Sequence, residues 1–196
     1  MSFFLGLTGS IGMGKSTTAQ MFRDEGIPVW DADAAVHQLY RAGGDAVEPI
    51  QNLFPAVIQD GQVSRAAVKG IIAEDSEALN KIESVVHPLV AEHRQNFIDS
   101  HDDQLLVFDI PLLFETDANH WLDAILVVTA PPDVQRDRVM QRPGMTKAQF
   151  NALLERQVPD VEKRARADYI IETLTLDDTH AAVRKLISEL KGVSDA

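Results

Sequence analysis

The sequence predicts a protein of the α/β class, with a mainly parallel five-stranded sheet flanked by helices. Five short apolar runs have the length and composition of buried strands, namely Phe3 to Leu7, Ile27 to Trp30, Leu105 to Asp109, Ala124 to Thr129 and Asp168 to Ile171. Segments with helical spacing separate these runs, and parallel neighbouring strands need such crossovers. The 196 residues contain no linker, repeat or low-complexity tract, so we expect a single domain with an excursion.

The helices are predicted from apolar spacing and from their ends. One helix, Lys15 to Asp24, follows a glycine-rich run, and another is expected over Ala34 to Arg41. The stretch from Asp45 to Ser100 is polar, mostly helical and strand-poor. Its apolar residues at helical spacing include Leu79, Ile82, Val85, Val86 and Leu89. The last helix starts at Asp177 and Asp178, and its apolar face carries Val183, Leu186, Ile187 and Leu190.

Charge and composition exclude several classes of protein. A net charge of -12 would repel a polyanion over most of the surface, which argues against a nucleic-acid or membrane-surface binder. The absence of cysteine excludes disulfides, thiolate zinc sites and cysteine nucleophiles. The opening MSFFLGL lacks the basic region and the apolar length of a signal peptide, so we expect a cytoplasmic protein. Nothing in the composition indicates an oligomeric state.

The run GSIGMGKST, Gly9 to Thr17, matches the phosphate-loop pattern G-x-x-x-x-G-K-[ST] and lies between a predicted strand and a predicted helix. Glycines let the backbone wrap phosphates, Lys15 supplies charge to the β and γ phosphates, and Ser16 offers an oxygen to Mg²⁺. A bare glycine turn is the alternative. We therefore predict ATP and Mg²⁺ as ligands, held by a loop whose binding residues are Gly9, Ile11, Gly12, Met13, Gly14, Lys15, Ser16 and Thr17.

The motif alone does not say where the phosphate goes. A GTPase would need a guanine-reading N-K-x-D at a strand end, and the near match Asn80-Lys81-Ile82-Glu83 lies inside a polar helical stretch. Motor ATPases usually need more chain than this one has. A small-molecule kinase is the leading class, with a nucleoside-monophosphate-type kinase and a non-catalytic nucleotide sensor as alternatives.

Carboxylates at two strand ends favour the kinase. Asp31 and Asp33 are two residues apart, so by strand periodicity both can point into the crevice beside the phosphate loop. Phosphoryl transfer to a hydroxyl needs a carboxylate that orients it and takes its proton, and we expect Asp33 in that role. Asp31 could instead cap the following helix. Asp109 ends another strand, where an acidic residue near the metal is common, and the apolar IPLLFE after it suits packing against an acceptor.

A basic segment lies within this acidic chain, since residues 135–166 hold eight basic and four acidic residues. Arg138 and Arg142 are four residues apart and are expected on one helix face, directly before Pro143-Gly144. Thr146 and Gln149 then form a capping-box pattern that starts a new helix. A solvated, ion-paired helix would explain the charge. A mobile lid that brings its arginines onto the phosphates also explains it, and would exclude water.

These motifs together resemble the bacterial dephospho-CoA kinases. The resemblance is carried by GSIGMGKST, by DAD at 31–33, by His87-Pro88-Leu89 and by FDIPLLFE at 108–115. It also includes Gln135, Arg138, Arg142, Gln157, Lys163 and Ala167-Asp168. The chain departs from the family pattern at Glu172-Thr173-Leu174, where the family has an asparagine and a glycine beside the adenine, and at Ala73, where it often has a phenylalanine.

The resemblance implies a phosphate-loop kinase that phosphorylates the 3'-hydroxyl of the ribose of dephospho-CoA with ATP. It implies a nucleotide core of about residues 1–44 and 101–196, a helical acceptor domain of about 45–100 and a lid of about 136–166. Asp33, Lys15 and Arg142 would be catalytic, Arg138 and Arg142 would bind ATP, and Ser16 and Asp109 would hold the metal. The acceptor would be bound by Thr8, Asp31, Asp33, Arg65, His87, Pro111 and Leu112. The alternative for His87 is a helix-breaking His-Pro corner.

Overall fold

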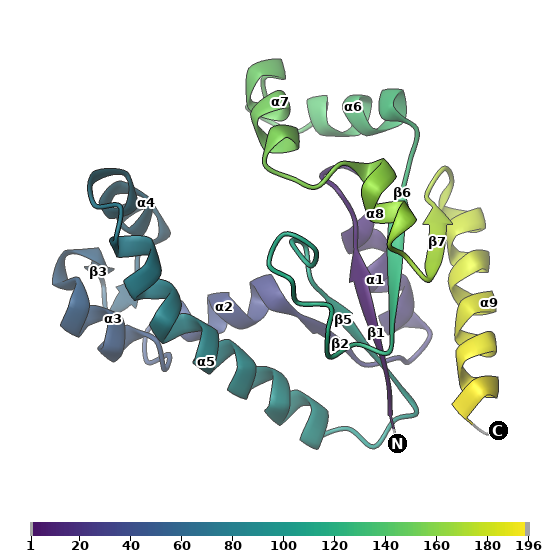
Figure 1. The fold of residues 1–196 in the computed structure, drawn as a ribbon, viewed down its shortest axis with the longest axis horizontal. Coiled ribbons are helices and arrows are strands. Elements are labelled where there is room, and N and C mark those ends of the chain that lie inside the picture. The colour runs from purple at the N-terminus through teal and green to yellow at the C-terminus, as the bar shows by residue number, and fades with distance from the viewer. Residues whose placement is uncertain (1, 195–196) are drawn as a thin grey trace. The chain divides into compact units, whose positions relative to one another are not determined.

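The computed structural model describes residues 2–194, which form two compact units. The first unit contains residues up to Trp30 and from Asp102 onward, and the second unit contains Asp31–His101. Figure 1 shows their elements along the chain. The expected domain boundary near residue 45 falls inside the second unit. Among residues 2–194, no helix combines the length and the apolar character needed to cross a lipid bilayer.

The first unit is built on a five-stranded sheet in the order β2-β5-β1-β6-β7. The strands are β1 (Phe3–Thr8), β2 (Val29–Asp31), β5 (Leu105–Asp109), β6 (Ala124–Thr129) and β7 (Tyr169–Glu172). β1 pairs in parallel with β5 and β6, and β6 pairs in parallel with β7. The predicted fold class is confirmed, and the predicted strands are shifted by at most two residues at either end.

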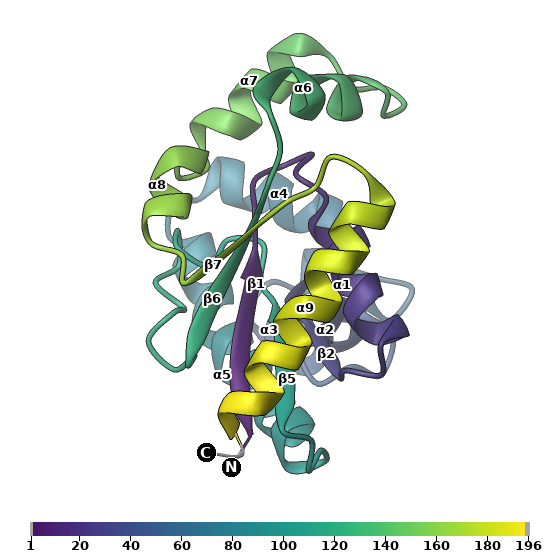
Figure 2. The same cartoon turned by 90° about the vertical axis from the view of Figure 1, so that its right-hand side faces the viewer.

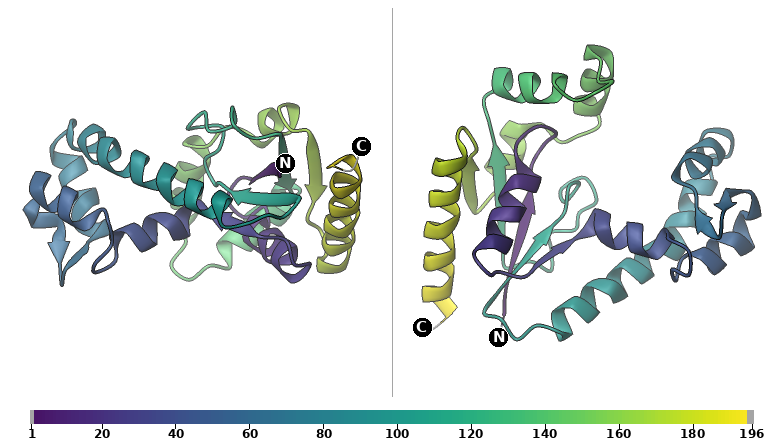
Figure 3. Two further views of the ribbon diagram at one scale, coloured as in Figure 1. Left: turned by 90° about the horizontal axis from the view of Figure 1, so that it is seen from below. Right: turned by 180° about the vertical axis from the view of Figure 1, so that it is seen from behind.

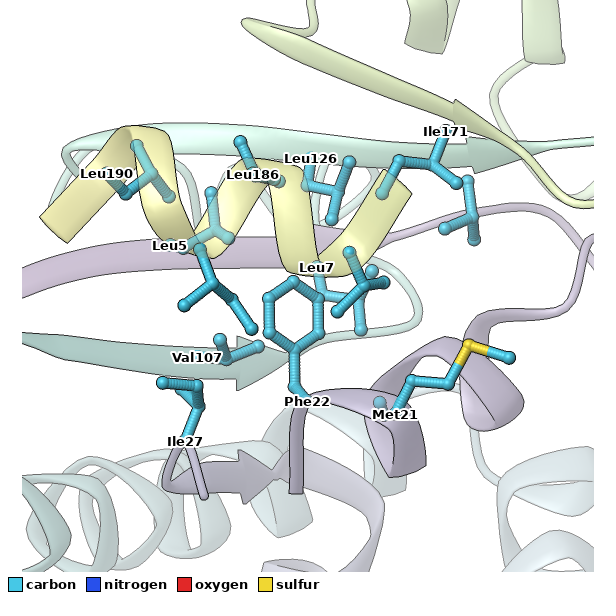
Figure 4. Packing of buried hydrophobic residues seen from close by; sticks show 14 of the residues in the cluster. Leu5, Leu7, Met21, Phe22, Ile27, Val107, Leu126, Ile171, Leu186 and Leu190 are labelled. Atoms are coloured by element: carbon cyan, nitrogen blue, oxygen red, sulfur yellow. The ribbon is translucent and has the colours of Figure 1, made fainter. Parts of the chain in front are cut away.

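One face of this sheet is covered by α1 (Lys15–Asp24) and α9 (Leu176–Ser194), which lie side by side in Figure 2. Phe22 is fully buried and points from α1 into the cluster formed with Leu5, Leu7, Val107 and the apolar face of α9 (Figure 4). The apolar spacing of the last helix predicted this face, since Val183, Leu186, Ile187 and Leu190 are all buried.

The connection between β5 and β6 is irregular, whereas we expected helices between all strands. Single turns form in it, for example where the Thr116 N–H donates to the Leu112 carbonyl, but they do not continue. Asp117 adopts a φ of 51°, which ends a right-handed helix at that point. The segment still covers the second face of the sheet, because Trp121 packs edge-on against Phe108, with ring centroids 4.8 Å apart.

Three further helices of the first unit follow β6. They are α6 (Pro132–Met140), α7 (Lys147–Glu155) and α8 (Asp160–Ala165). The predicted capping box at the start of α7 is confirmed, with Thr146 and Gln149 bonded reciprocally. In the right-hand view of Figure 3, α6 and α7 lie beyond the carboxyl ends of β1 and β6.

The second unit is mostly helical, as expected. Its helices are α2 (Ala32–Tyr40), α3 (Val47–Leu53), α4 (Arg65–Glu74) and α5 (Ala78–Asp99), with a 3-10 turn at Pro55–Val57. α3 and α4 gather around the first half of α5 (Figure 3, left), over a core that includes Ile50, Val68 and Ile82. A small hairpin of β3 (Ile58–Gln59) and β4 (Gln62–Val63) turns through Asp60-Gly61, both at positive φ, as Asp-Gly turns require.

The alternative interpretation of His87, a His-Pro corner that breaks the helix, is wrong. α5 continues through Pro88, and both His87 and Pro88 are exposed. Proline in a helix removes one hydrogen bond and clashes with the preceding turn. The helix persists because tertiary packing of Ile82 and Val86 on the same segment holds it against the core of the second unit.

Core packing generates the first prediction. Phe22→Ala should lower the free energy of unfolding by about 3 to 5 kcal/mol, because it removes a fully buried ring and leaves a cavity. Urea denaturation monitored by circular dichroism measures this loss. Gln20→Ala, on the exposed side of the same helix, is the matched control. A loss for Phe22→Ala no larger than that of the control would contradict the packing described.

Candidate active site

The run Gly9–Thr17 connects β1 to α1 and lines a cavity of about 410 Å³. All nine of its residues contribute to the wall. The rest of the wall comes from Thr18 and Pro111, from Arg138, Arg142 and Gln157, and from five residues of the segment 173–179. Because the loop ends at the first turn of α1, its backbone N–H groups and the positive end of the helix favour an anion here.

Glycine is required at three points of this loop. A Cβ on Gly9 would stand 2.6 Å from Cγ2 of Val128 and 2.7 Å from its carbonyl oxygen. Gly12 and Gly14 have φ values of 79° and 86°, which residues with a side chain rarely adopt. A Cβ on Gly14 would also stand 2.8 Å from Oγ1 of Thr173. The loop is therefore packed against β6 and against the segment after β7 at van der Waals distance.

Lys15 lies at the cavity wall and forms an ion pair with Asp109, with Nζ 2.5 Å from Oδ1. Asp109 is buried at the end of β5, where it pairs in register with Leu7 of β1. Strand pairing thus brings together two residues that are 94 positions apart. Asp109 was predicted as a metal ligand. Among residues 2–194 no group of three or more His, Cys, Asp or Glu side chains could hold a metal.

The oxygens present suit Mg²⁺, which usually takes one or two protein ligands and completes its shell with water and phosphates. Ser16 carries an exposed hydroxyl on the cavity wall, and the carboxylate of Asp109 lies beside Lys15. One hydroxyl and one carboxylate at a phosphate loop are a donor set of that kind. The assignment of Ser16 and Asp109 to the metal stays a prediction.

Thr173, directly after β7, joins three parts of the site. Its hydroxyl lies 2.9 Å from the carbonyl of Met13 in the loop and accepts a hydrogen bond from Nη1 of Arg138 at 2.9 Å. Nη2 of Arg138 donates to the Thr173 carbonyl. Arg138 is therefore fixed across the cavity. Sequence reasoning noticed Thr173 only as a departure from a family pattern.

The two predicted arginines do not share a helix face, because α6 ends at Met140 and Arg142 lies in the turn that follows. The next residue is Pro143, which disfavours helical geometry at Arg142, and Gly144 has a φ of 75°. Both arginines nevertheless line the cavity. Arg142 is exposed, and its side chain forms no hydrogen bond or ion pair within residues 2–194, so it is the more adjustable of the two.

The loop peptide at Ile11 is held from two directions. Its N–H donates to Oε1 of Gln157 at 3.0 Å, and its carbonyl accepts from Nε2 of Gln135 at 2.8 Å. The motifs quoted in the resemblance contained both glutamines but indicated no role for them.

A buried ion pair lies behind Gln157. Lys163 of α8 has no exposed surface, and its Nζ is 2.8 Å from Oε1 of Glu115. The same oxygen accepts a hydrogen bond from the Val158 N–H at 2.9 Å. Burial by itself would raise the pKa of Glu115, but Lys163 and the Val158 N–H outweigh it and hold that pKa below its ordinary value.

The predicted acceptor residues belong to both units. Thr8 and Pro111 lie in the first unit, where the Thr8 hydroxyl donates to the Pro111 carbonyl at 3.2 Å, and Leu112 is 44% exposed. Asp31, Asp33, Arg65 and His87 lie in the second unit. There Arg65 begins α4, and its charge partly offsets the burial that raises the pKa of Tyr40.

The strand argument for Asp31 and Asp33 is wrong in its geometry. β2 ends at Asp31, and α2 begins at Ala32, so strand periodicity does not reach Asp33. Asp31 caps α2, accepting from the Ala34 N–H at 2.9 Å, which is the alternative that the sequence left open. Asp33 is exposed in the first helical turn.

The family model "Dephospho-CoA kinase" matches residues 3–178. A dephospho-CoA kinase of Ruegeria pomeroyi is 55% identical over 191 residues, covering 97% of both chains. One from Jannaschia sp. is 56% identical, covering 97% of this chain and 98% of the relative.

The chain belongs to the dephospho-CoA kinase family.

Solved structures share the fold of this chain. A Thermus thermophilus protein is 35% identical, with a TM-score of 0.84 over 96% of this chain and 98% of that one. A dephospho-CoA kinase from Campylobacter jejuni has the same fold, with a TM-score of 0.66 at 23% identity over 96% and 97% of the two chains. The dephospho-CoA kinase family model spans residues of both compact units and ends inside α9.

Lys15 generates the second prediction. Lys15→Met should lower turnover by at least about 100-fold, because the positive charge that stabilises the phosphates in the transition state is lost. It should also lower the melting temperature, because Asp109 loses the charge that compensates it. Adding Asp109→Asn should restore the melting temperature without restoring turnover. Lys185→Met, at an exposed position of α9, is the matched control. Near-normal turnover of Lys15→Met would rule out the assignment of Lys15.

Proposed function

We propose that this protein transfers the γ-phosphoryl group of ATP to the 3'-hydroxyl of the ribose of dephospho-CoA, giving coenzyme A and ADP. The observation that carries the proposal is the glycine-lined cavity with Lys15 on its wall, in a chain that belongs to the dephospho-CoA kinase family. Its substrates are then small molecules. We place the protein in the cytoplasm and propose no nucleic-acid or membrane partner.

ATP would bind with its phosphates on the backbone of Gly9–Thr17. Gly12 and Gly14 supply the backbone conformation, and Lys15 supplies positive charge to the β and γ phosphates. Ser16 and Asp109 would hold Mg²⁺, which neutralises charge on the phosphates when it is bound. Lys15 would then lie between the phosphates and the buried carboxylate of Asp109.

The base would lie at the end of the cavity lined by Leu174, Thr175 and Leu176. Leu174 and Leu176 are 49% and 67% exposed, and exposed leucines on a cavity wall suit the face of a purine. Arg138 is held beside them by Thr173, so its planar guanidinium can stack on the ring. The departure from the family pattern at 172–174 therefore still leaves an apolar wall for the adenine.

The second unit, Asp31–His101, would bind the acceptor. Support comes from Arg65 on α4 and His87 on α5, which the family resemblance assigns to this task, and from their location in one compact unit. A cationic Arg65 suits the phosphates of dephospho-CoA. We propose that Thr8, Pro111 and Leu112 also bind the acceptor, and that Asp31 positions the neighbouring Asp33 by capping α2.

Asp33 would orient the ribose hydroxyl and accept its proton, and Arg142 would stabilise the transferring phosphoryl group. Arg142 suits this role because it is exposed on the cavity wall and is not held by another group within residues 2–194. We propose residues 136–166 as the lid. Its closure over bound ATP would exclude water and so prevent ATP hydrolysis.

A coupled assay of ADP release tests the function. With ATP, Mg²⁺ and dephospho-CoA, ADP should form together with a product heavier by one phosphate, detected by mass spectrometry. Omission of dephospho-CoA should reduce ADP release to a small background. Shikimate and AMP, as acceptors of other small phosphate-loop kinases, should give no such product. Equal ADP release with and without dephospho-CoA would overturn the proposal.

Asp33 generates a prediction of its own. Asp33→Asn should lower turnover by about 100- to 1,000-fold, the lower half of the range that general-base catalysis contributes, since asparagine is a far poorer base. ATP affinity should stay close to that of the wild type. Glu48→Gln removes another exposed carboxylate from the first turn of a helix in the same unit and is the matched control. If Asp33→Asn keeps more than about a tenth of wild-type turnover, the base is elsewhere.

A further inference from the structure

The tip of the phosphate loop is held by two neutral side chains from distant parts of the chain. Gln157 accepts a hydrogen bond from the Ile11 N–H at 3.0 Å, and Gln135 donates to the Ile11 carbonyl at 2.8 Å. One peptide group on either side of Ile11 is thus fixed in direction. Both glutamines lie in the first unit, and Gln135 is 6% exposed.

The positions of the two glutamines in the chain give this arrangement a second consequence. Gln135 directly precedes residues 136–156, and Gln157 directly follows them. This segment carries Arg138 and Arg142 and includes α7. Both of its ends are therefore attached to the same residue of the phosphate loop. A shift of the loop at Ile11 would be transmitted to both ends of the segment.

The ion pair of Glu115 and Lys163 contacts the backbone directly after Gln157. Oε1 of Glu115 accepts from the N–H of Val158, the next residue after Gln157, at 2.9 Å. Nζ of Lys163 lies 2.8 Å from that same oxygen. A buried ion pair adds little net stability compared with apolar residues of the same volume. Its location, one peptide away from Gln157, indicates a positioning role instead.

Fixing this peptide matters because the loop binds phosphate through backbone N–H groups. A loop that must be ordered when ATP binds spends part of the binding free energy on lost conformational entropy. The glutamines suit the task because they are neutral, whereas a carboxylate at either position would repel the phosphates.

We propose that Gln135 and Gln157 are positioning residues that preorganise the phosphate loop for ATP, and that Glu115 and Lys163 act through the Val158 peptide to place Gln157. The inference rests on the proposed kinase function, since it concerns ATP bound at this loop. It adds residues that do not touch the reacting atoms and that set ATP affinity and the anchoring of residues 136–156.

Methionine substitutions test the two glutamines, because methionine keeps the volume and removes the hydrogen bonds. Gln157→Met and Gln135→Met should each raise the KM for ATP by about two- to tenfold, the range expected for one hydrogen bond. The KM for dephospho-CoA should change by less than this. Gln141→Met, at an exposed position after α6, should leave both constants unchanged.

The dissociation constant of ATP, measured by titration calorimetry without dephospho-CoA, should rise by the same factor as the KM for ATP. A merely structural role would affect the KM values of both substrates equally, and that result would overturn the proposal. So would unchanged ATP binding in both glutamine variants. An inactive wild-type enzyme would instead refute the proposed function, and calorimetry would still report on ATP binding.

The proposed role of Glu115 and Lys163 must be tested in variants that fold, since removal of one partner alone leaves the other charge buried and unpaired. Glu115→Gln with Lys163→Met removes both charges and keeps an acceptor oxygen for Val158, whereas Glu115→Leu with Lys163→Met removes that acceptor as well. The first pair should bind ATP nearly as the wild type does, and the second should bind it about two- to tenfold more weakly. Addition of Gln157→Met to the second pair should weaken binding little further. Equal affinities of the two pairs, or a full additive loss in the triple variant, would contradict the link through Val158.

Discussion

The structure depends on one constraint, the close approach of the phosphate-loop backbone to the elements around it. A side chain on Gly9 would collide with Val128 of β6, and one on Gly14 would collide with Thr173. Without these approaches the loop would stand away from the sheet edge, and Lys15 would not reach Asp109 at the end of β5. The parallel pairing of β1 with β5 and β6 therefore has a chemical purpose, because it brings the carboxyl ends of three strands to one loop.

Features encoded in consecutive residues could be predicted from the sequence. The phosphate loop, the capping box at Thr146 and the apolar face of α9 each need only local spacing, and the structure contains all three. Arg142 was misplaced because the end of α6 depends on the Pro143-Gly144 turn. The periodicity argument for Asp33 failed because strand β2 is short and Asp31 already caps the next helix.

Contacts between distant segments could not be predicted. Thr173 and Met13 are 160 residues apart, and nothing local to either residue indicates their contact. The same holds for Gln157 and Ile11, which are 146 residues apart, and for the irregular crossover between β5 and β6, which the positive φ of Asp117 interrupts. The excess of basic residues at 135–166 could be recognised from the sequence. Only the fold shows that Arg138 and Arg142 line the cavity and that Lys163 is buried.

The aromatic cluster on the second face of the sheet gives the protein an intrinsic optical probe. The chain has two tryptophans, and both pack on Phe108, Trp121 at 4.8 Å and Trp30 at 6.1 Å between ring centroids. Phe108 directly precedes Asp109, Trp30 directly precedes Asp31, and Trp121 lies in the crossover that carries Pro111 and Glu115. Indole emission is sensitive to the polarity around the ring. Ultraviolet-excited fluorescence of the unlabelled protein therefore reports on the side of the sheet opposite α1 and α9, near the ends of β2 and β5 and in the crossover that follows β5.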